Sequence, residues 1–163
     1  MVAIVAFQAA LAPHFERLNR DWIERYFSVE PPDLALFADP HAAVILPGGQ
    51  ILFALEGEAV LGTCAVLKSG AGEMELAKMA VAPSAQGRGI GRQLGEAAIA
   101  FAREAGADRL VLISNSRLTP AIALYQRLGF HQAALPHDTG YTRGDVFMTL
   151  DLQTHDSRLT THD

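Results

Sequence analysis

The residues best suited to chemistry lie in a short glycine-rich stretch near the middle of the chain, Gln86–Gly91, with the sequence QGRGIG. A strand pattern precedes this stretch and a helix pattern follows it. The first turn of a helix exposes about four backbone N–H groups, with a partial positive charge behind them. Glycine permits positive φ and lets an anion approach the backbone closely. The stretch therefore predicts a phosphate-binding turn.

The spacing of the glycines limits which phosphate ligand fits. No Gly-Lys-Ser/Thr follows, so the stretch is not a Walker loop. Gly87 and Gly89 match the dinucleotide pattern, but its third glycine is required where this chain has Arg92. A nucleotide-binding α/β protein is therefore disfavoured, and a tight turn without any ligand is the other interpretation.

Composition narrows the class of protein. The chain has 163 residues, half of them hydrophobic and 19% charged, which predicts one soluble domain. A net charge of −5 argues against nucleic acid and anionic membranes as partners. Cys64 is the single cysteine, which fits a reducing compartment. We expect a cytoplasmic location, because the chain shows neither a signal-peptide pattern nor an apolar run of about 20 residues.

The N-terminal part predicts a strand and two helices ahead of the central sheet. Val2–Phe7 is short and apolar, and an apolar stripe at helical spacing follows from Phe15 to Tyr26. Pro31 and Pro32 end that segment, and Asp33–Ala38 predicts a short second helix. A strand followed by two helices is consistent with a mixed α/β fold.

The central part predicts a meander followed by a crossover. Strands Gln50–Leu55, Ala59–Lys68 and Glu73–Val81 are joined by short turns and so should be antiparallel. Helix Arg92–Ala105 then leads to strand Arg109–Ser114, which should lie parallel to Glu73–Val81.

The last part predicts one more helix and two strands. Thr119 is the expected N-cap and Pro120 the first helical residue of a helix that runs to Leu128. Strands Phe130–Ala133 and Val146–Leu152 follow. We expect a single domain over residues 1–152 and a polar tail over 153–163.

Two motifs at a fixed separation resemble the GCN5-related N-acetyltransferase (GNAT) family. The first is Gln86-x-x-Gly89-x-Gly91 after a strand, and the second is LYxxLGF at residues 124–130, after the next strand. The resemblance covers about Ile51–Phe130. It implies a mostly antiparallel sheet with a parallel strand pair around the coenzyme site, about four helices, and acetyl-CoA as cosubstrate. The six histidines are not at metal-ligand spacing, so no metal is expected.

The same resemblance implies how the coenzyme is held. The backbone of Met79 and Val81 should pair with the pantetheine arm as though it were another strand. The pyrophosphate should bind the turn formed by Gln86, Gly87, Arg88, Gly89, Ile90, Gly91 and Arg92. Many members place an asparagine where this chain has Leu118, so Asn115, three residues upstream, is the candidate coenzyme ligand.

A general base is useful because an alkylamine with a pKa near ~10.4 is protonated at neutral pH. Glu75 lies eleven residues before Gln86, the spacing of the catalytic glutamate in histone-type members. Strand alternation places Glu75 on one face with Ala77, Met79 and Val81, where apolar company would raise its pKa. Glu73 has the same parity and is the substitute, and a solvated or salt-bridged Glu75 is the alternative.

Tyr125 is the candidate general acid, because in the family the tyrosine of the second motif commonly lies beside the coenzyme sulfur. The apolar face of its helix is Ala121, Leu124 and Leu128, which predicts Tyr125 at the margin of that face. The alternative is a half-buried packing tyrosine. Cys64 is similarly open to two interpretations, an acylated nucleophile or a small core residue.

Acceptor contacts are expected from two regions. Trp22, Tyr26 and Phe27 lie in the helical segment that helps shape the acceptor pocket in the family, although core packing is the alternative. Tyr141 and Arg143 precede the last strand, in a loop that often borders that pocket, and an arginine would suit an acceptor carboxylate.

The sequence therefore predicts an N-acetyltransferase that moves the acetyl group of acetyl-CoA directly to a primary amine on a small molecule, peptide or protein. The alternative is a non-catalytic acyl-CoA-binding module that acts as a sensor or regulator. Dimerisation is common in the family, so a homodimer is one expected assembly, on which the sequence itself is silent.

Overall fold

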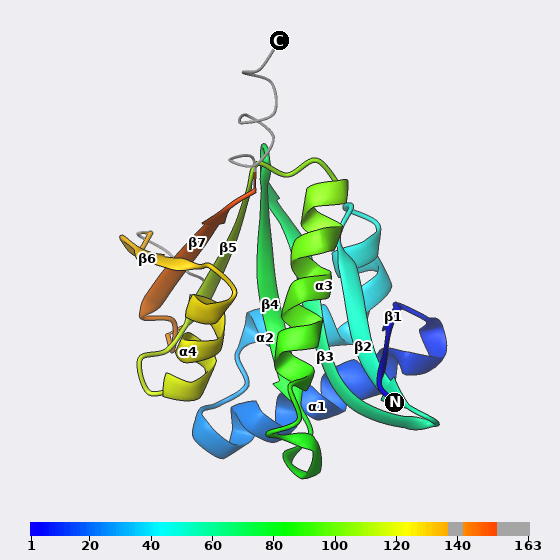
Figure 1. Cartoon of the computed structure of the whole chain (residues 1–163). Helices are drawn as coiled ribbons and strands as arrows, with labels where there is room; N and C mark the ends of the chain where they lie inside the picture. Colours follow the sequence, from blue (N-terminus) through cyan, green and yellow to red (C-terminus); the bar gives the residue numbers. More distant parts are fainter. Residues whose placement is uncertain (137–141, 153–163) are drawn as a thin grey trace.

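The computed structural model describes residues 1–136 and 142–152, and within them one mixed sheet forms the centre of the molecule (Figure 1). Its strand order is β1-β2-β3-β4-β5-β7-β6. The strands are β1 (Ala3–Ala6), β2 (Gln50–Glu56), β3 (Ala59–Gly70), β4 (Glu73–Val81), β5 (Arg109–Ser114), β6 (His131–Ala133) and β7 (Val146–Asp151). Neighbouring strands are antiparallel except for β4 and β5, which are parallel. The predicted fold class is confirmed. The expected tail, 153–163, lies outside the described residues.

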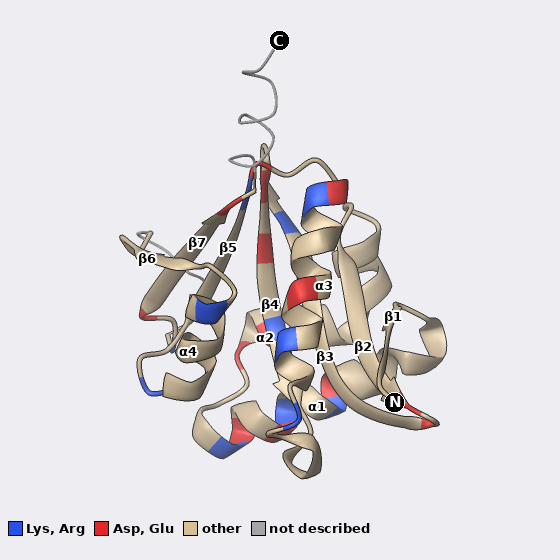
Figure 2. Ribbon diagram, viewed as in Figure 1, with Lys and Arg blue, Asp and Glu red and all other residues tan. Residues whose placement is uncertain are grey.

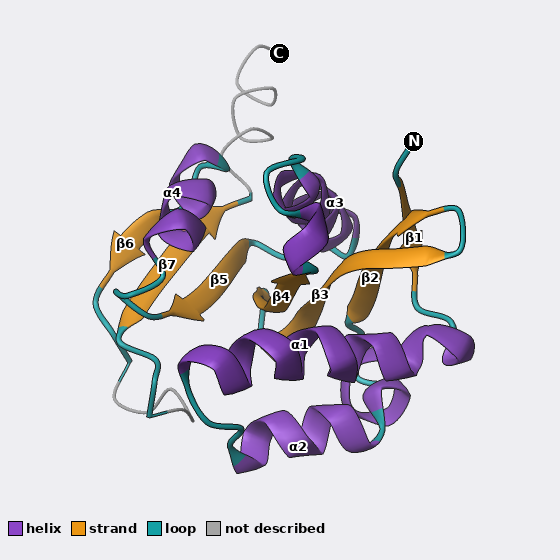
Figure 3. Ribbon diagram, turned by 90° about the horizontal axis from the view of Figure 1, so that it is seen from below, coloured by secondary structure: helices purple, strands orange, loops and turns teal. Residues whose placement is uncertain are grey.

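Helices cover both faces of this sheet, with α1 and α2 on one side and α3 and α4 on the other (Figure 3). Their bounds are α1 (Ala12–Tyr26), α2 (Pro31–Ala38), α3 (Ile90–Glu104) and α4 (Thr119–Arg127), with short turns at Ala9–Leu11, His41–Ile45 and Pro83–Ala85. Each face has its own apolar core: Phe15, Ile23 and Phe53 lie in one, and Leu94 and Leu110 in the other. None of the described helices combines the length and apolar character that a membrane crossing requires.

Three helices begin at different residues from those predicted. The two prolines start α2 instead of preceding it, because a proline costs no hydrogen bond in the first turn. Helix α3 begins at Ile90, two residues early, so that Gly89 is its N-cap. The N-cap of α4 is Leu118, without a side-chain hydrogen bond, so the predicted Thr119 cap is wrong.

A bulge in β4 changes which face its side chains occupy. Thr63 pairs with Ala80, but Ala65 pairs with Ala77, so Lys78 and Met79 together lie opposite a single residue of β3. An extra residue inverts the alternation of a strand beyond it. Met74 and Leu76 face the α3–α4 core before the bulge, and Met79 and Val81 face it after the bulge.

The parallel pairing of β4 with β5 is short. It joins Glu73–Glu75 to Arg109–Val111, after which the two strands diverge (Figure 1). Beyond Glu75, no strand among the described residues pairs with the β5-facing edge of β4. That edge therefore presents backbone N–H and C=O groups available to an extended ligand.

Candidate active site

The glycine-rich turn has the geometry of an anion site. Gly87 and Gly89 have φ of +83° and +78°, a conformation that favours glycine. A Cβ added at either position would meet nothing within 4 Å, so the turn faces open space. The first backbone bond of α3 runs from the Gln93 amide to the Gly89 carbonyl. Within the described chain, the amides at 90–92 consequently have no backbone acceptor, and they are available to an anion.

Side chains around the turn add a partly balanced charge. The Arg88 guanidinium forms an exposed ion pair with Glu56 at the end of β2, with an N–O distance of 2.5 Å. Arg92 pairs with Glu96 one turn further along α3, at 2.9 Å. Gln86 is exposed. The amides, not the arginines, are thus the unpaired donors at this turn. The Arg88–Glu56 contact gave no signal in the sequence, since 32 residues separate the two.

Helix α4 lies against the first turns of α3, which places the second motif beside the glycine turn. A Cβ on Gly91 would come within 3.2 Å of Leu124, and one on Gly95 within 2.5 Å of Leu128. The two helices can therefore approach closely because α3 has glycines on the side that faces α4. The structure brings the two sequence motifs together, as their resemblance implied.

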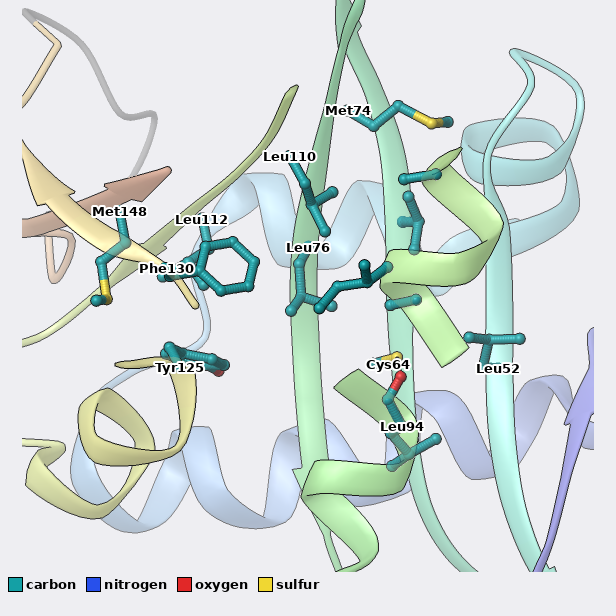
Figure 4. Close-up of a cluster of buried hydrophobic side chains, with 14 of the residues drawn as sticks. Leu52, Cys64, Met74, Leu76, Leu94, Leu110, Leu112, Tyr125, Phe130 and Met148 are labelled. Carbon is teal, nitrogen blue, oxygen red and sulfur yellow. Dashed lines mark hydrogen bonds between the residues drawn. The ribbon is translucent and has the colours of Figure 1, made fainter. Parts of the chain in front are cut away.

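Tyr125 is the one buried residue of α4, at 9% exposure, so the prediction that it lies at the margin of the apolar face is wrong. Its ring reaches from α4 towards β4 and packs edge-on against Phe130, with centroids 6.1 Å apart (Figure 4). Burial, and to a lesser extent the Cys64 thiol, raises the pKa of the Tyr125 phenol well above its usual value. The phenol therefore keeps its proton at neutral pH.

The Tyr125 hydroxyl oxygen is not sealed inside the core. No hydrogen bond links it to another described residue, and no enclosed side-chain N or O atom among the described residues lacks a partner. The hydroxyl oxygen must therefore reach the accessible surface, where a ligand could take its proton. Cys64 is different: it is fully buried, and burial raises the pKa of its thiol to about 12. A protonated, enclosed thiol is a poor nucleophile.

Glu75 lies on the opposite face from the one predicted with Met79 and Val81. It shares the α1–α2 face with Ala77, whereas the bulge turns Met79 and Val81 to the other side. Burial nonetheless raises the pKa of Glu75, with Glu73 adding to the effect and Lys78 opposing it. The predicted direction holds, but desolvation and not an apolar strand face is its cause.

Glu73, the substitute base, is occupied by other partners. Its carboxylate forms a cross-strand ion pair with Arg109 and accepts a hydrogen bond from Ser69 Oγ at 3.1 Å. Glu75 forms no ion pair or side-chain hydrogen bond with another described residue. The Glu73 carboxylate is thus already engaged by two side chains, so the geometry favours Glu75 over Glu73.

A buried charge cluster, which sequence analysis missed, lies on the α1–α2 face. Asp33 of α2 is fully buried and pairs with Lys78 of the β4 bulge. The Arg143 guanidinium also donates to both Asp33 oxygens, at 3.0 and 2.7 Å, and to Glu30 at 3.0 Å. Acidic and basic positions accordingly share strand β4 (Figure 2). The residues that pair between different elements are 45 to 113 positions apart in the sequence, so no local spacing could reveal the cluster.

The other residues predicted to contact the coenzyme or the acceptor lie in different surroundings. The Arg143 guanidinium already pairs with the carboxylates of Glu30 and Asp33, so nothing indicates that it binds a carboxylate of the acceptor. The Asn115 amide donates to the Arg143 carbonyl at 2.7 Å and its oxygen accepts from the Arg117 amide at 2.8 Å. Tyr26 is half exposed at the end of α1. Trp22 packs edge-on against Phe27, and Arg117 lies over the Phe27 ring. Tyr141 lies outside the described residues.

The model of a family described as Acetyltransferase (GNAT) family matches residues 14–130. The chain is 33% identical over 109 residues to the uncharacterised N-acetyltransferase YvbK of Bacillus subtilis, an alignment covering 65% of this chain and 70% of that protein.

Solved structures share the fold. A GNAT-family acetyltransferase from Staphylococcus aureus superposes with a TM-score of 0.85 at 17% identity, covering 93% of this chain and 99% of that one. A putative acetyltransferase from Salmonella typhimurium, solved with its cofactor acetyl-CoA, gives a TM-score of 0.71 at 24% identity, covering 93% and 94%. No group of three or more possible metal-binding side chains forms within the part of the chain that the structure describes.

Proposed function

Because this chain belongs to the GNAT acetyltransferase family and is an acetyl-CoA-dependent acetyltransferase, we propose that it transfers the acetyl group directly to a primary amine. Tyr125 acts as general acid and Glu75 as general base in this proposal. The observation that supports it is the open glycine turn, which contacts α4 through Gly91 and Leu124 and lies at the end of the β4 edge that β5 leaves.

The residues present fit the coenzyme. Acetyl-CoA supplies an activated thioester and a thiolate leaving group. The amides at 90–92 would bind its pyrophosphate, and the space beside Gly87 and Gly89 leaves room for that group. The backbone of Met79 and Val81, on the edge that β5 leaves, would hydrogen-bond the pantetheine arm.

The two catalytic groups have opposite tasks, and their surroundings suit them. Glu75, on the α1–α2 face, would take a proton from the ammonium of the acceptor, directly or through water, and a raised pKa makes it a better base. Tyr125, on the α3–α4 face, would give its proton to the departing sulfur. The acceptor would then enter from the α1–α2 side, where Tyr26 remains a candidate contact.

A direct route is favoured over an acylated cysteine. The only cysteine of the chain is fully enclosed, and its Sγ contacts the Leu94 carbonyl at 3.8 Å. A thiol that is both buried and protonated cannot accept an acetyl group without local opening.

The test is a screen of amines with the purified protein and acetyl-CoA. Thiol release should depend on an added primary amine, and mass spectrometry should find that amine heavier by one acetyl group. A Cys64→Ala variant should retain this activity. Coenzyme binding without thiol release for any amine would instead support the alternative, a non-catalytic sensor or regulator.

A further inference from the structure

Lys78 combines two unfavourable properties at the bulge of β4. Its φ is +55°, and among residues 1–136 and 142–152 it is the one non-glycine with positive φ. Its side chain is also buried, at 5% exposure. Left-handed backbone costs free energy for any residue with a Cβ, and a buried ammonium costs more unless it is paired. Some compensating interaction must therefore hold Lys78 in place.

Asp33 supplies that interaction from a preformed anchor. Its carboxylate pairs with the Lys78 ammonium and accepts a hydrogen bond from the Glu30 amide at 2.9 Å, which fixes it at the start of α2. Arg143 donates to both of its oxygens. A carboxylate held from three sides can define where the ammonium lies, and so which conformation the lysine backbone adopts.

The conformation at Lys78 decides how the next residues of β4 are presented. The bulge turns the side chains of Met79 and Val81 to the α3–α4 face, within the stretch that no longer pairs with β5. A regular strand would place these residues one step out of phase and rotate their backbone groups with them.

We propose that the Asp33–Lys78 ion pair is a positioning device that holds the β4 bulge, and with it the strand edge that receives the coenzyme. The inference rests on the proposed binding of the coenzyme to Met79 and Val81. Both residues of the pair act through the backbone that they fix and are not catalytic residues themselves.

Two substitutions at Lys78 separate positioning from simple stabilisation. Lys78→Met keeps the aliphatic volume but loses the ion pair, so nothing compensates the left-handed backbone. Lys78→Gly also loses the ion pair and buries less side chain, yet glycine adopts positive φ without strain. A pair that only stabilises the fold would make Gly the worse of the two in every measurement.

The experiment measures acetyl-CoA affinity by isothermal titration calorimetry, together with thermal melting. Lys78→Met should weaken binding about 10-fold, the factor expected from the cost of left-handed backbone. Lys78→Gly should weaken it less than about threefold, because the bulge persists, although it should melt at the lower temperature. Lys68→Met, a matched change at an exposed position of β3, should bind like the wild type.

Wild-type affinity in Lys78→Met, or weaker binding in Lys78→Gly than in Lys78→Met, would overturn the inference. If Lys78→Met fails to fold, Asp33→Asn removes the charge at constant size and should show the same loss of about 10-fold. Coenzyme binding needs no acceptor, so a negative amine screen would affect the proposed function and leave this comparison intact.

Discussion

At the scale of single residues, the proposed mechanism depends on two titratable groups that lie in separate surroundings. Tyr125 lies in the α3–α4 core and Glu75 on the α1–α2 face, so the sheet stands between the proposed acid and base. Burial raises the pKa of both. For the carboxylate this strengthens a base, whereas the phenol is protonated at neutral pH with or without the shift.

Replacing Tyr125 by Phe should lower kcat by about 100-fold, the lower end of the range for general acid–base catalysis, because a coenzyme thiolate leaves fairly readily. Acetyl-CoA affinity and melting temperature should stay close to wild type, since the hydroxyl makes no hydrogen bond to a described residue. Steady-state kinetics and calorimetry check this. Unchanged kcat would remove Tyr125 from the mechanism.

Replacing Glu75 by Gln should abolish the acidic limb of the pH profile of kcat/KM, since that limb reports ionisation of the free enzyme's base. Glu73→Gln is the matched control: it breaks the ion pair with Arg109 but should keep the limb. A limb that persists in Glu75→Gln and disappears in Glu73→Gln would reverse the assignment.

The same Glu75→Gln variant should also change stability in a defined pH window. The folded pKa of Glu75 lies above its unfolded value, so the folded state favours the protonated form. Wild-type stability from this group is present below the unfolded pKa of about 4.3 and is lost as pH rises through the folded pKa. Urea unfolding should therefore show the variant equal to wild type at acidic pH and more stable at pH 8.

Sequence alone located these residues but not their surroundings. The second motif identified Tyr125, yet helical periodicity placed it at a margin, because a single tyrosine adds little to an apolar stripe. Alternation along β4 failed for Glu75 because one left-handed lysine inverts it, and lysine carries no signal for positive φ. The pairing of Glu73 with Arg109 follows from strand register, which only the fold supplies.

At the scale of elements, helix α3 has the proposed coenzyme-binding turn at one end and an ordinary glycine stop at the other. Gly89 precedes its first residue and Gly106 follows its last turn, with φ of +78° and +84°. A Cβ would meet nothing within 4 Å at either position. The two glycines thus have the same backbone conformation and equally open surroundings. They differ in that a ligand is proposed to bind only beside Gly89.

Gly89→Ala and Gly106→Ala should each lower the free energy of unfolding by about 1 to 2 kcal/mol, the cost of left-handed backbone for an L-residue. Only Gly89→Ala should also weaken acetyl-CoA binding, because the neighbouring amides at 90–92 form the proposed pyrophosphate site. Chemical denaturation and calorimetry of both variants make the comparison. Equal loss of affinity in the two would mean that the turn is merely the start of a helix.

Most elements could be predicted because their patterns are local. The hairpin around Gly57, the crossover from β4 to β5 and the stop at Gly129 all follow from neighbouring residues. The errors concern boundaries: prolines that begin α2, a glycine that caps α3, and a leucine that caps α4. Such boundaries depend on the backbone conformation of single residues, which hydrophobic periodicity does not resolve to better than one or two positions.

At the scale of the whole molecule, one buried cluster ties together segments from both ends of the chain. Glu30 and Asp33 come from the start of α2, Lys78 from the middle of the sheet, and Arg143 from the segment before β7. Asn115 extends the contact to the loop ahead of α4 through the Arg143 carbonyl. The acceptor side of the proposed site is therefore built on charges that satisfy one another.

Asp33→Asn should be among the most destabilising polar substitutions, because it leaves two cations around a neutral amide. At pH 7 the free energy of unfolding should fall by about 3 to 5 kcal/mol, the range for breaking a buried pair on one side. Asp21→Asn, which breaks an exposed pair with Arg25 on α1, should cost no more than about 0.5 kcal/mol. Urea unfolding of both variants gives the comparison.

The pH dependence of that difference follows from the pKa of Asp33. Burial alone would raise it, but hydrogen bonds from Arg143, Lys78 and the Glu30 amide outweigh burial and lower it. The stabilisation is then complete above the unfolded pKa of about 3.9 and is lost as pH falls through the folded pKa. Wild type and Asp33→Asn should therefore differ by a constant amount between about pH 5 and 7, and converge in stronger acid. A difference that persists undiminished to about pH 2 would show that Asp33 stabilises the fold through its shape and not its charge.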